Sequence, residues 1–144
     1  MAHKIIRLAA VLGALSVALG AFGAHLLKDY VSAFPDAAKR MEWWEKAVDY
    51  HVAHTLLLLG IGILAKHAPL PLWRYATLSL SFGIVVFSGS LYIMTITGLR
   101  WLGAITPIGG IALIIGWLIL FVGGRRLDAE RKTAPSAQEM SSPP

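Results

Sequence analysis

Four long apolar runs alternate along the chain with shorter segments that carry most of its charges. The runs cover residues 8–24, 52–65, 75–97 and 102–122. A helix needs about 20 residues to cross ~30 Å of hydrocarbon, and a segment in lipid must satisfy its own backbone hydrogen bonds. The pattern predicts an all-α membrane protein, a bundle of four transmembrane helices spanning about residues 5–27, 47–65, 73–97 and 101–123.

The second run is too short to span hydrocarbon by itself. Its 14 residues make a helix of about 21 Å. Lys66 and Pro69 prevent extension at the far end, so the helix has to grow backwards through Asp49. His51 and His54 therefore lie within the span or at its edge.

The segment before the second run has the period of an amphipathic helix. Polar residues recur at steps of three, four and three, and the opposite face is apolar; the first set is Lys39, Glu42, Lys46 and Asp49, the second Met41, Trp44 and Val48. Pro35 and Asp36 supply a start signal. We predict an interfacial helix over about residues 36–47 that runs into the second span, with Trp43 and Trp44 at headgroup level and a Glu42–Lys46 pair on its surface.

Small residues at helical spacing predict close helix packing. The first run has Ser16, Gly20 and Ala24 four residues apart, the third has Ser79 and Gly83, and the fourth has Gly109, Ala112, Gly116 and Gly123. Pro107 near the start of the fourth run should kink or restart that helix. These residues are interpreted as packing contacts.

The first 25 residues also resemble a secretory signal, because a basic head and an apolar body precede small residues. The apolar body is longer than the usual 7–15 residues of such signals, and its small residues suit helix packing. We therefore expect this segment to remain as the first span.

Composition supports the membrane assignment and leaves little room for nucleic acid. Hydrophobic residues make up 56% of the chain and charged residues 15%, and the mean hydropathy is +0.65. The net charge of +5 comes from basic residues that flank the spans, with no aromatic-basic groove for a nucleic acid.

Eight Lys and Arg residues lie on the side of the two termini, against five on the other side; the first set is Lys4, Arg7, Lys66, Arg74, Arg125, Arg126, Arg131 and Lys132, the second Lys28, Lys39, Arg40, Lys46 and Arg100. This bias predicts a multi-pass membrane protein with both termini cytoplasmic.

Residues 1–124 are predicted to form the transmembrane domain, and residues 125–144 a basic, then Ser/Pro-rich tail that is mostly disordered. The chain has no cysteine, which removes disulfides, thiolate metal sites and cysteine nucleophiles. No phosphate-binding loop, dinucleotide fingerprint or nucleophile elbow is present. We expect a protein that is not an enzyme, and we predict no cofactor.

Four ordered motifs resemble the small bacterial membrane proteins called domain of unknown function 423. They are GAFGAH at 20–25, an aromatic residue before AHTLLLLG, FSGSLY at 87–92, and TPIGG at 106–110 followed by GW at 116–117. That family is similar to a small mitochondrial transmembrane protein of animals. The resemblance covers about residues 8–122 and implies a compact four-helix membrane protein of unknown biochemical activity.

Carried over residue by residue, the resemblance marks a set of polar and small positions: His25, Tyr50, His54, Ser88, Gly89, Ser90, Tyr92, Thr106, Pro107, Gly109 and Gly110. His51 departs from the pattern, because family members more often have glutamine there. A site of three histidines is therefore not implied as a family property.

Independently of the resemblance, the predicted topology brings one group of polar residues to the outer half of the membrane: His25, Tyr50, His51, His54, Tyr92 and Thr106. One interpretation is interhelical hydrogen bonding that fixes helix register. A second is metal or haem binding by His25, His51 and His54. A third is a path for protons or a small solute. It would need an oligomer, because one four-helix unit is too small to enclose a pore, and the inner half has few polar residues to line it.

The absence of catalytic motifs favours a small accessory, assembly or self-associating subunit of unknown biochemical activity. Its partners would be the lipid bilayer and either a membrane protein or further copies of itself. The Trp43/Trp44 helix outside and the basic tail inside are its expected contact surfaces.

Overall fold

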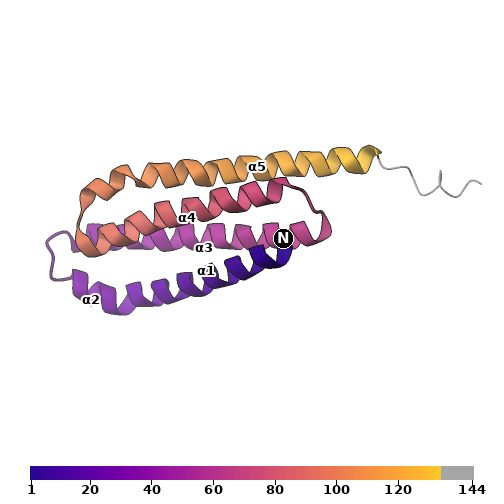
Figure 1. Cartoon of the computed structure of the whole chain (residues 1–144). Coiled ribbons are helices and arrows are strands. Elements are labelled where there is room, and N and C mark those ends of the chain that lie inside the picture. The colour runs from indigo at the N-terminus through magenta and orange to yellow at the C-terminus, as the bar shows by residue number, and fades with distance from the viewer. Residues whose placement is uncertain (134–144) are drawn as a thin grey trace, which may run out of the picture.

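The computed structural model of the protein describes residues 1–133, without the side chains at 130, 131 and 133 (Figure 1). Helix α1 (Ala2–Phe22) continues through a π-helical turn, η1 (Gly23–Leu27), into the short α2 (Lys28–Val31). Then follow α3 (Ala37–His67), α4 (Leu72–Thr97), the 3-10 turn η2 (Arg100–Ala104) and α5 (Thr106–Thr133). The Ser/Pro-rich part of the predicted tail lies outside the described residues.

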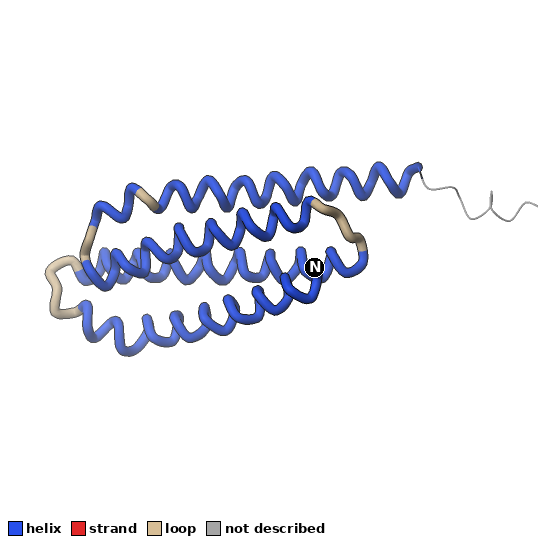
Figure 2. Tube along the Cα trace, viewed as in Figure 1, coloured by secondary structure: helices blue, strands red, loops and turns tan. Residues whose placement is uncertain are grey.

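Four helical segments of the described chain are long and apolar enough to cross a membrane, namely Ala2–Val31, Ala37–His67, Leu72–Thr97 and Arg100–Ala129. They confirm the predicted all-α fold with four transmembrane helices. The N-terminus, the α3–α4 turn and the far end of α5 lie at one end of the molecule, here called the terminal end (Figures 1 and 2). The opposite end, with α2 and η2, is called the loop end.

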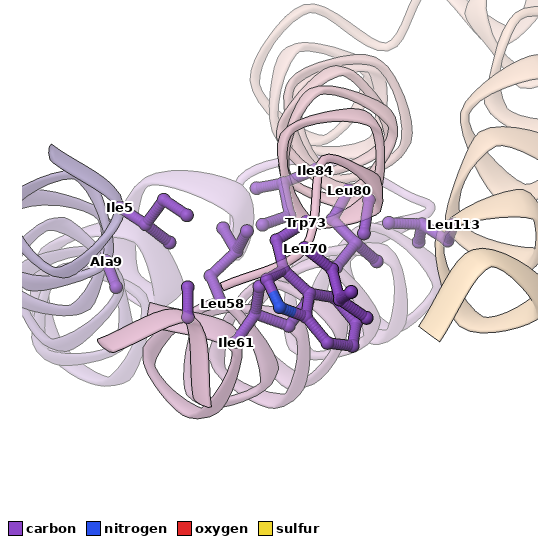
Figure 3. Packing of buried hydrophobic residues seen from close by; sticks show 11 residues of the cluster. Ile5, Ala9, Leu58, Ile61, Leu70, Trp73, Leu80, Ile84 and Leu113 are labelled. Carbon is purple, nitrogen blue, oxygen red and sulfur yellow. The ribbon is translucent and has the colours of Figure 1, made fainter. Parts of the chain in front are cut away.

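The helices pack in chain order, α1 on α3, α3 on α4 and α4 on α5. Side chains from all four meet in one buried core, consisting of Ile5, Ala9, Leu58, Ile61, Ala65, Leu70, Trp73, Ala76, Leu80, Ile84 and Leu113 (Figure 3). Since each helix packs mainly on its neighbours in sequence, the bundle is open. One groove separates α1 from α4, and another separates α3 from α5.

Glycines bring α4 and α5 together. A Cβ atom on Gly109 would collide with the backbone of Phe87, and one on Gly116 would collide with Leu80. In the same interface, the Ser79 hydroxyl donates a 2.7 Å hydrogen bond to the Ala112 carbonyl on α5. Gly89 differs, because a Cβ atom there would meet nothing within 4 Å.

The loop end is held by the buried guanidinium of Arg40, which is 8% exposed. Its Nη1 donates to the Thr95 carbonyl at 3.0 Å and to the Ile96 carbonyl at 3.4 Å, at the end of α4 where helical carbonyls lack partners. Its Nε donates to Asp36 Oδ1 at 2.8 Å. Gly98 ends α4 with φ +73°, and any side chain there would collide with the Arg40 guanidinium.

Trp73 closes the terminal end. It is fully buried, and its indole N–H donates a 2.7 Å bond to the Ala68 carbonyl just after α3. A Cβ atom on Gly123 of α5 would collide with the Trp73 ring. Leu127 packs against the same core, which gives α5 a reason to continue beyond Gly124 into residues assigned to the tail.

The predicted interfacial helix runs without a break into the second span as the first part of α3, because its apolar stripe is continuous with that of the span. Two other expectations about the loop end need correction. Trp44 is 2% exposed and packs against Leu27 and Val31, so it cannot form an outer contact surface. Glu42 pairs with Lys39 at 2.8 Å instead of Lys46.

The Trp44 indole also reaches α1. Its N–H donates to the Leu19 carbonyl at 3.1 Å, and the absence of a side chain at Gly23 makes room for the indole.

Pro107 lies in the first turn of α5, where its missing N–H has no intrahelical partner to lose. The proline therefore restarts the fourth helix after η2.

We predict that the Arg40–Asp36 contact makes stability depend on pH. The hydrogen bond from Arg40 lowers the pKa of the Asp36 carboxyl, so this contribution is present above the unfolded pKa of about 3.9 and is lost as pH falls through the lower folded pKa. Thermal unfolding in detergent should show the melting temperature falling between about pH 5 and pH 3, less steeply in Asp36→Asn. Asp29→Asn, which removes an exposed carboxylate, is the control; an equal slope in wild type and Asp36→Asn contradicts the prediction.

Candidate functional site

A groove with a volume of about 550 Å³ lies between α3 and α5. We call it the His54 groove. Phe87 of α4 forms part of its floor, and the other lining residues are Asp49, Tyr50, Ala53 and His54 of α3 and Gly110, Leu113, Ile114 and Trp117 of α5. Most of this lining is apolar, so the groove suits an apolar occupant.

His54 ties α3 to α5 across this groove. Its Nδ1 lies 2.7 Å from the Tyr50 carbonyl, which can only accept. Its Nε2 lies 3.3 Å from the Trp117 indole N–H, which can only donate. Both bonds are satisfied when the ring has a proton on Nδ1 and a lone pair on Nε2.

Aromatic rings extend the contact around His54. The Tyr50 ring stacks on Phe87 of α4 with centroids 4.3 Å apart and on the His54 ring at 5.7 Å. The Trp117 ring meets His54 edge to face at 6.4 Å. The groove therefore has a preformed aromatic wall and needs no rearrangement to present it.

His51, three residues earlier, serves a different interface. It is 2% exposed, and its Nδ1 lies 3.3 Å from the Tyr92 hydroxyl on α4. The Tyr92 ring packs against Trp44 at 4.6 Å. His51 therefore belongs to the α1–α4 side of the molecule, while His54 belongs to the α5 side.

Thr106 forms a third polar contact, at the start of α5. Its hydroxyl lies 2.8 Å from that of Ser90 on α4 and 3.3 Å from the Leu102 carbonyl. This contact fixes the register of α4 against the restarted helix. It is separate from both histidines.

His25 does not join any of these contacts. It is exposed on the η1 turn of the first helical segment. Among residues 1–133, no group of three or more histidines, aspartates and glutamates is placed to hold a metal. The six predicted cluster residues thus separate into two pairs, Tyr50 with His54 and His51 with Tyr92, a threonine that bonds a serine outside the set, and one isolated ring. Both nitrogens of His54 are already engaged.

Two residues that form important contacts, Trp117 and Arg40, are not identified by the sequence pattern. Trp117 lies in an apolar run and looks like a lipid-facing residue, although its indole is the one side-chain N–H between positions 102 and 122. That property is the signal that could have identified it as the partner of a buried ring. In the sequence, Arg40 resembles the other basic residues that flank the spans, and no periodicity distinguishes it from Lys39.

A family model and individual relatives of the chain agree on one family of membrane proteins. Residues 19–110 match the family model described as Protein of unknown function (DUF423). A UPF0382 membrane protein of Staphylococcus saprophyticus is 47% identical over 117 residues, 78% of this chain and 92% of the relative. The UPF0382 inner membrane protein YgdD of Escherichia coli K12 is 38% identical over 120 residues, 83% of this chain and 87% of the relative. No solved structure matches.

We predict a measurable coupling between His54 and Trp117. Trp117→Phe keeps an aromatic ring and removes the indole donor, and His54→Ala removes the acceptor. In a double-mutant cycle of unfolding in detergent, the coupling should be about 0.6 kcal/mol and at most ~2 kcal/mol, as for other polar contacts between membrane helices. Trp101→Phe, at an exposed indole on η2, is the control partner and should show no coupling to His54→Ala. Zero coupling for Trp117 would contradict the contact.

Proposed function

We propose, for a chain that belongs to the DUF423 family of bacterial membrane proteins, the role of a non-enzymatic subunit that assembles within the membrane. The His54 groove carries this proposal. It is open toward lipid, preformed and mostly apolar. Helices in lipid associate through close packing of their surfaces, so such a groove is suited to receive a further helix.

The groove offers small residues on both walls. Ala53 lies on the α3 wall and Gly110 on the α5 wall, and small residues let a neighbouring backbone approach closely. Trp117 and Tyr50 supply broad apolar surfaces beside them. The combination favours a helix with large aliphatic side chains as the occupant.

The chain itself carries a matching surface on α5. Four large residues spaced three, four and three apart form an exposed aliphatic ridge: Ile108, Ile111, Ile115 and Leu118. The ridge and one wall of the groove lie on the same helix. A two-fold contact between copies would therefore place each ridge in the groove of the other, and we take the occupant to be a second copy of this chain.

The two other functions left open by the sequence have less support. Metal or haem binding would require His54 to give up one of its two hydrogen bonds, and His25 lies elsewhere. A solute path would need polar groups through the terminal half, where the core is built from apolar side chains such as Ile5, Leu58 and Trp73. Assembly requires neither change.

The proposal includes an orientation in the membrane. We place the protein in the bacterial inner membrane with the terminal end in the cytoplasm, because more Lys and Arg residues flank that end. Arg40 is one of the five basic residues at the loop end, but it does not weaken this bias. Its guanidinium binds α4 carbonyls and Asp36, so its place at the loop end has a structural cause that is independent of orientation.

We predict that two copies can be cross-linked through the groove. The chain has no cysteine, so Ala53→Cys and Ile111→Cys can be introduced singly into two differently tagged copies and oxidised in native membranes. A disulfide-linked heterodimer is expected. Val17→Cys replaces a residue of α1 that is 72% exposed and, paired with Ile111→Cys, should give none. No dimer with Ala53→Cys, or a cross-link from Ala53→Cys to a different protein alone, contradicts self-assembly.

Orientation has its own test. Green fluorescent protein fused to the C-terminus should be fluorescent, and alkaline phosphatase inserted after Ala33, in the connection between α2 and α3, should be active. Green fluorescent protein is fluorescent on the cytoplasmic side of the inner membrane, and alkaline phosphatase is active on the opposite side. A non-fluorescent C-terminal fusion together with an inactive phosphatase insertion would show that the terminal end faces outward.

A further inference from the structure

A further groove lies at the terminal end of the bundle, between the first two turns of α1 and those of α4. Its volume is about 500 Å³, and we call it the Lys4–Arg74 groove after the two cationic side chains in its lining. Both helices begin at this end of the molecule (Figure 1), so both walls run in the same direction. The other side chains that the argument uses are Ile5, Leu8 and Leu78.

The polarity of the groove changes along the bundle axis in the same way on both walls. Lys4 and Arg74 are each the third residue of their helix. Leu8 and Leu78 follow them four residues later on the same helix faces. One helical turn, about 5.4 Å, therefore separates a charged entrance from an apolar interior. Ile5, which is 3% exposed, also belongs to the apolar lining.

The two cations have no carboxylate partner among the described residues. The three ion pairs of residues 1–133 all lie at the loop end and involve Asp36 or Glu42. No Asp or Glu of the described chain lines the groove, and Asp128 is on α5, which does not reach it. Arg74 lies over the ring of Tyr75, with its Cζ atom 5.2 Å from the centroid, a contact that leaves the positive charge uncompensated.

These features suit a ligand with one anionic end and one apolar end. Lys and Arg bind phosphate through charge-assisted hydrogen bonds, and both cationic side chains are exposed and therefore accessible. Basic pockets between transmembrane helices are suited to phospholipid headgroups. A soluble anion would use the cations but would leave the apolar interior at Leu8 and Leu78 without a contact.

The apolar walls continue toward the loop end. A smaller groove of about 170 Å³ lies between the same two helices, and its lining includes Leu12 and Leu15 of α1 and Val85 of α4. Leu8, Leu12 and Leu15 lie on one face of α1, because they are four and three residues apart. The two grooves together offer a path between α1 and α4 along which an acyl chain can lie.

We infer that the Lys4–Arg74 groove binds an anionic glycerophospholipid, with its phosphate between the two cations and an acyl chain along Leu8 and Leu78. A phosphocholine headgroup fits less well, because its ammonium group would lie near the same cations. The inference does not rest on the proposed assembly, which uses the groove between α3 and α5. It also holds for either orientation in the membrane, because it depends only on the end of the bundle that carries the cations.

Two double variants that remove the same charge test the role of these cations. Lys4→Gln/Arg74→Gln removes both positive charges from the groove. Arg7→Gln/Lys66→Gln removes two positive charges from the same end of the molecule, at exposed positions that do not line the groove, and is the matched control. Because all four side chains are exposed, both variants should fold and should melt at the same temperature without added lipid.

The experiment is a titration of the purified full chain in neutral detergent with phosphatidylglycerol, with bound lipids counted by native mass spectrometry. Phosphatidylcholine with the same acyl chains is the zwitterionic reference. Wild type and the control variant should bind one phosphatidylglycerol per chain, about tenfold more tightly than phosphatidylcholine. The groove variant should lose about thirtyfold in affinity, since each Lys or Arg near anionic lipid contributes about fivefold. Inorganic phosphate in excess should not displace the lipid.

Other results overturn the inference. An equal loss of affinity in the two double variants would show that net charge alone attracts the lipid, and no loss in the groove variant would place the lipid elsewhere. Equal affinities for phosphatidylglycerol and phosphatidylcholine would show that only the acyl chains are recognised. Displacement of the lipid by inorganic phosphate would assign the two cations to a soluble anion instead.

Discussion

The backbone of a membrane helix must satisfy its own hydrogen bonds until it reaches water or another donor. At the end of α4 the donor is Arg40, which binds the Thr95 and Ile96 carbonyls from the first turn of α3. Gly98 makes this possible twice over, because it adopts a positive φ and leaves space for the guanidinium. The start of α3 is thereby fixed against the end of α4. This contact therefore sets the position of the α3 residues along the bundle axis relative to those of α4.

The packing of the helices follows from where the small residues lie. Gly109 and Gly116 face α4 and bring α5 against it, and α5 reaches α3 through the contact between Trp117 and His54. At the opposite edge, α1 contacts α3 through Gly62, where an added Cβ atom would strike Ile6. Close contacts between successive helices produce an open row. The row leaves two grooves on opposite sides of α3. His54 lines the groove beside α5, and His51 lines the groove between α1 and α4.

Much of this architecture was predictable because it depends on hydrophobic length and period. The short second run required α3 to begin before His51, and the stripe of Met41 and Trp44 placed the first part of α3 on the same face as its span. The directions of the histidines were not predictable. His51 and His54 are three residues apart, about 60° around a helix, which suggested one cluster. That angle is enough to separate them when α1 and α4 cover one side of α3 and α5 approaches the other.

The assignment of Trp44 shows the same limit. An amphipathic period identifies the apolar face of a helix, but it cannot say whether that face meets lipid headgroups or protein. Trp44 meets protein because Gly23 leaves a space on the first helical segment that the indole fills, and its N–H reaches the Leu19 carbonyl. Recognising this pair from sequence requires knowing that residues 21 positions apart lie side by side. The partners of the polar atoms can therefore be identified only once the positions of the helices relative to one another are known.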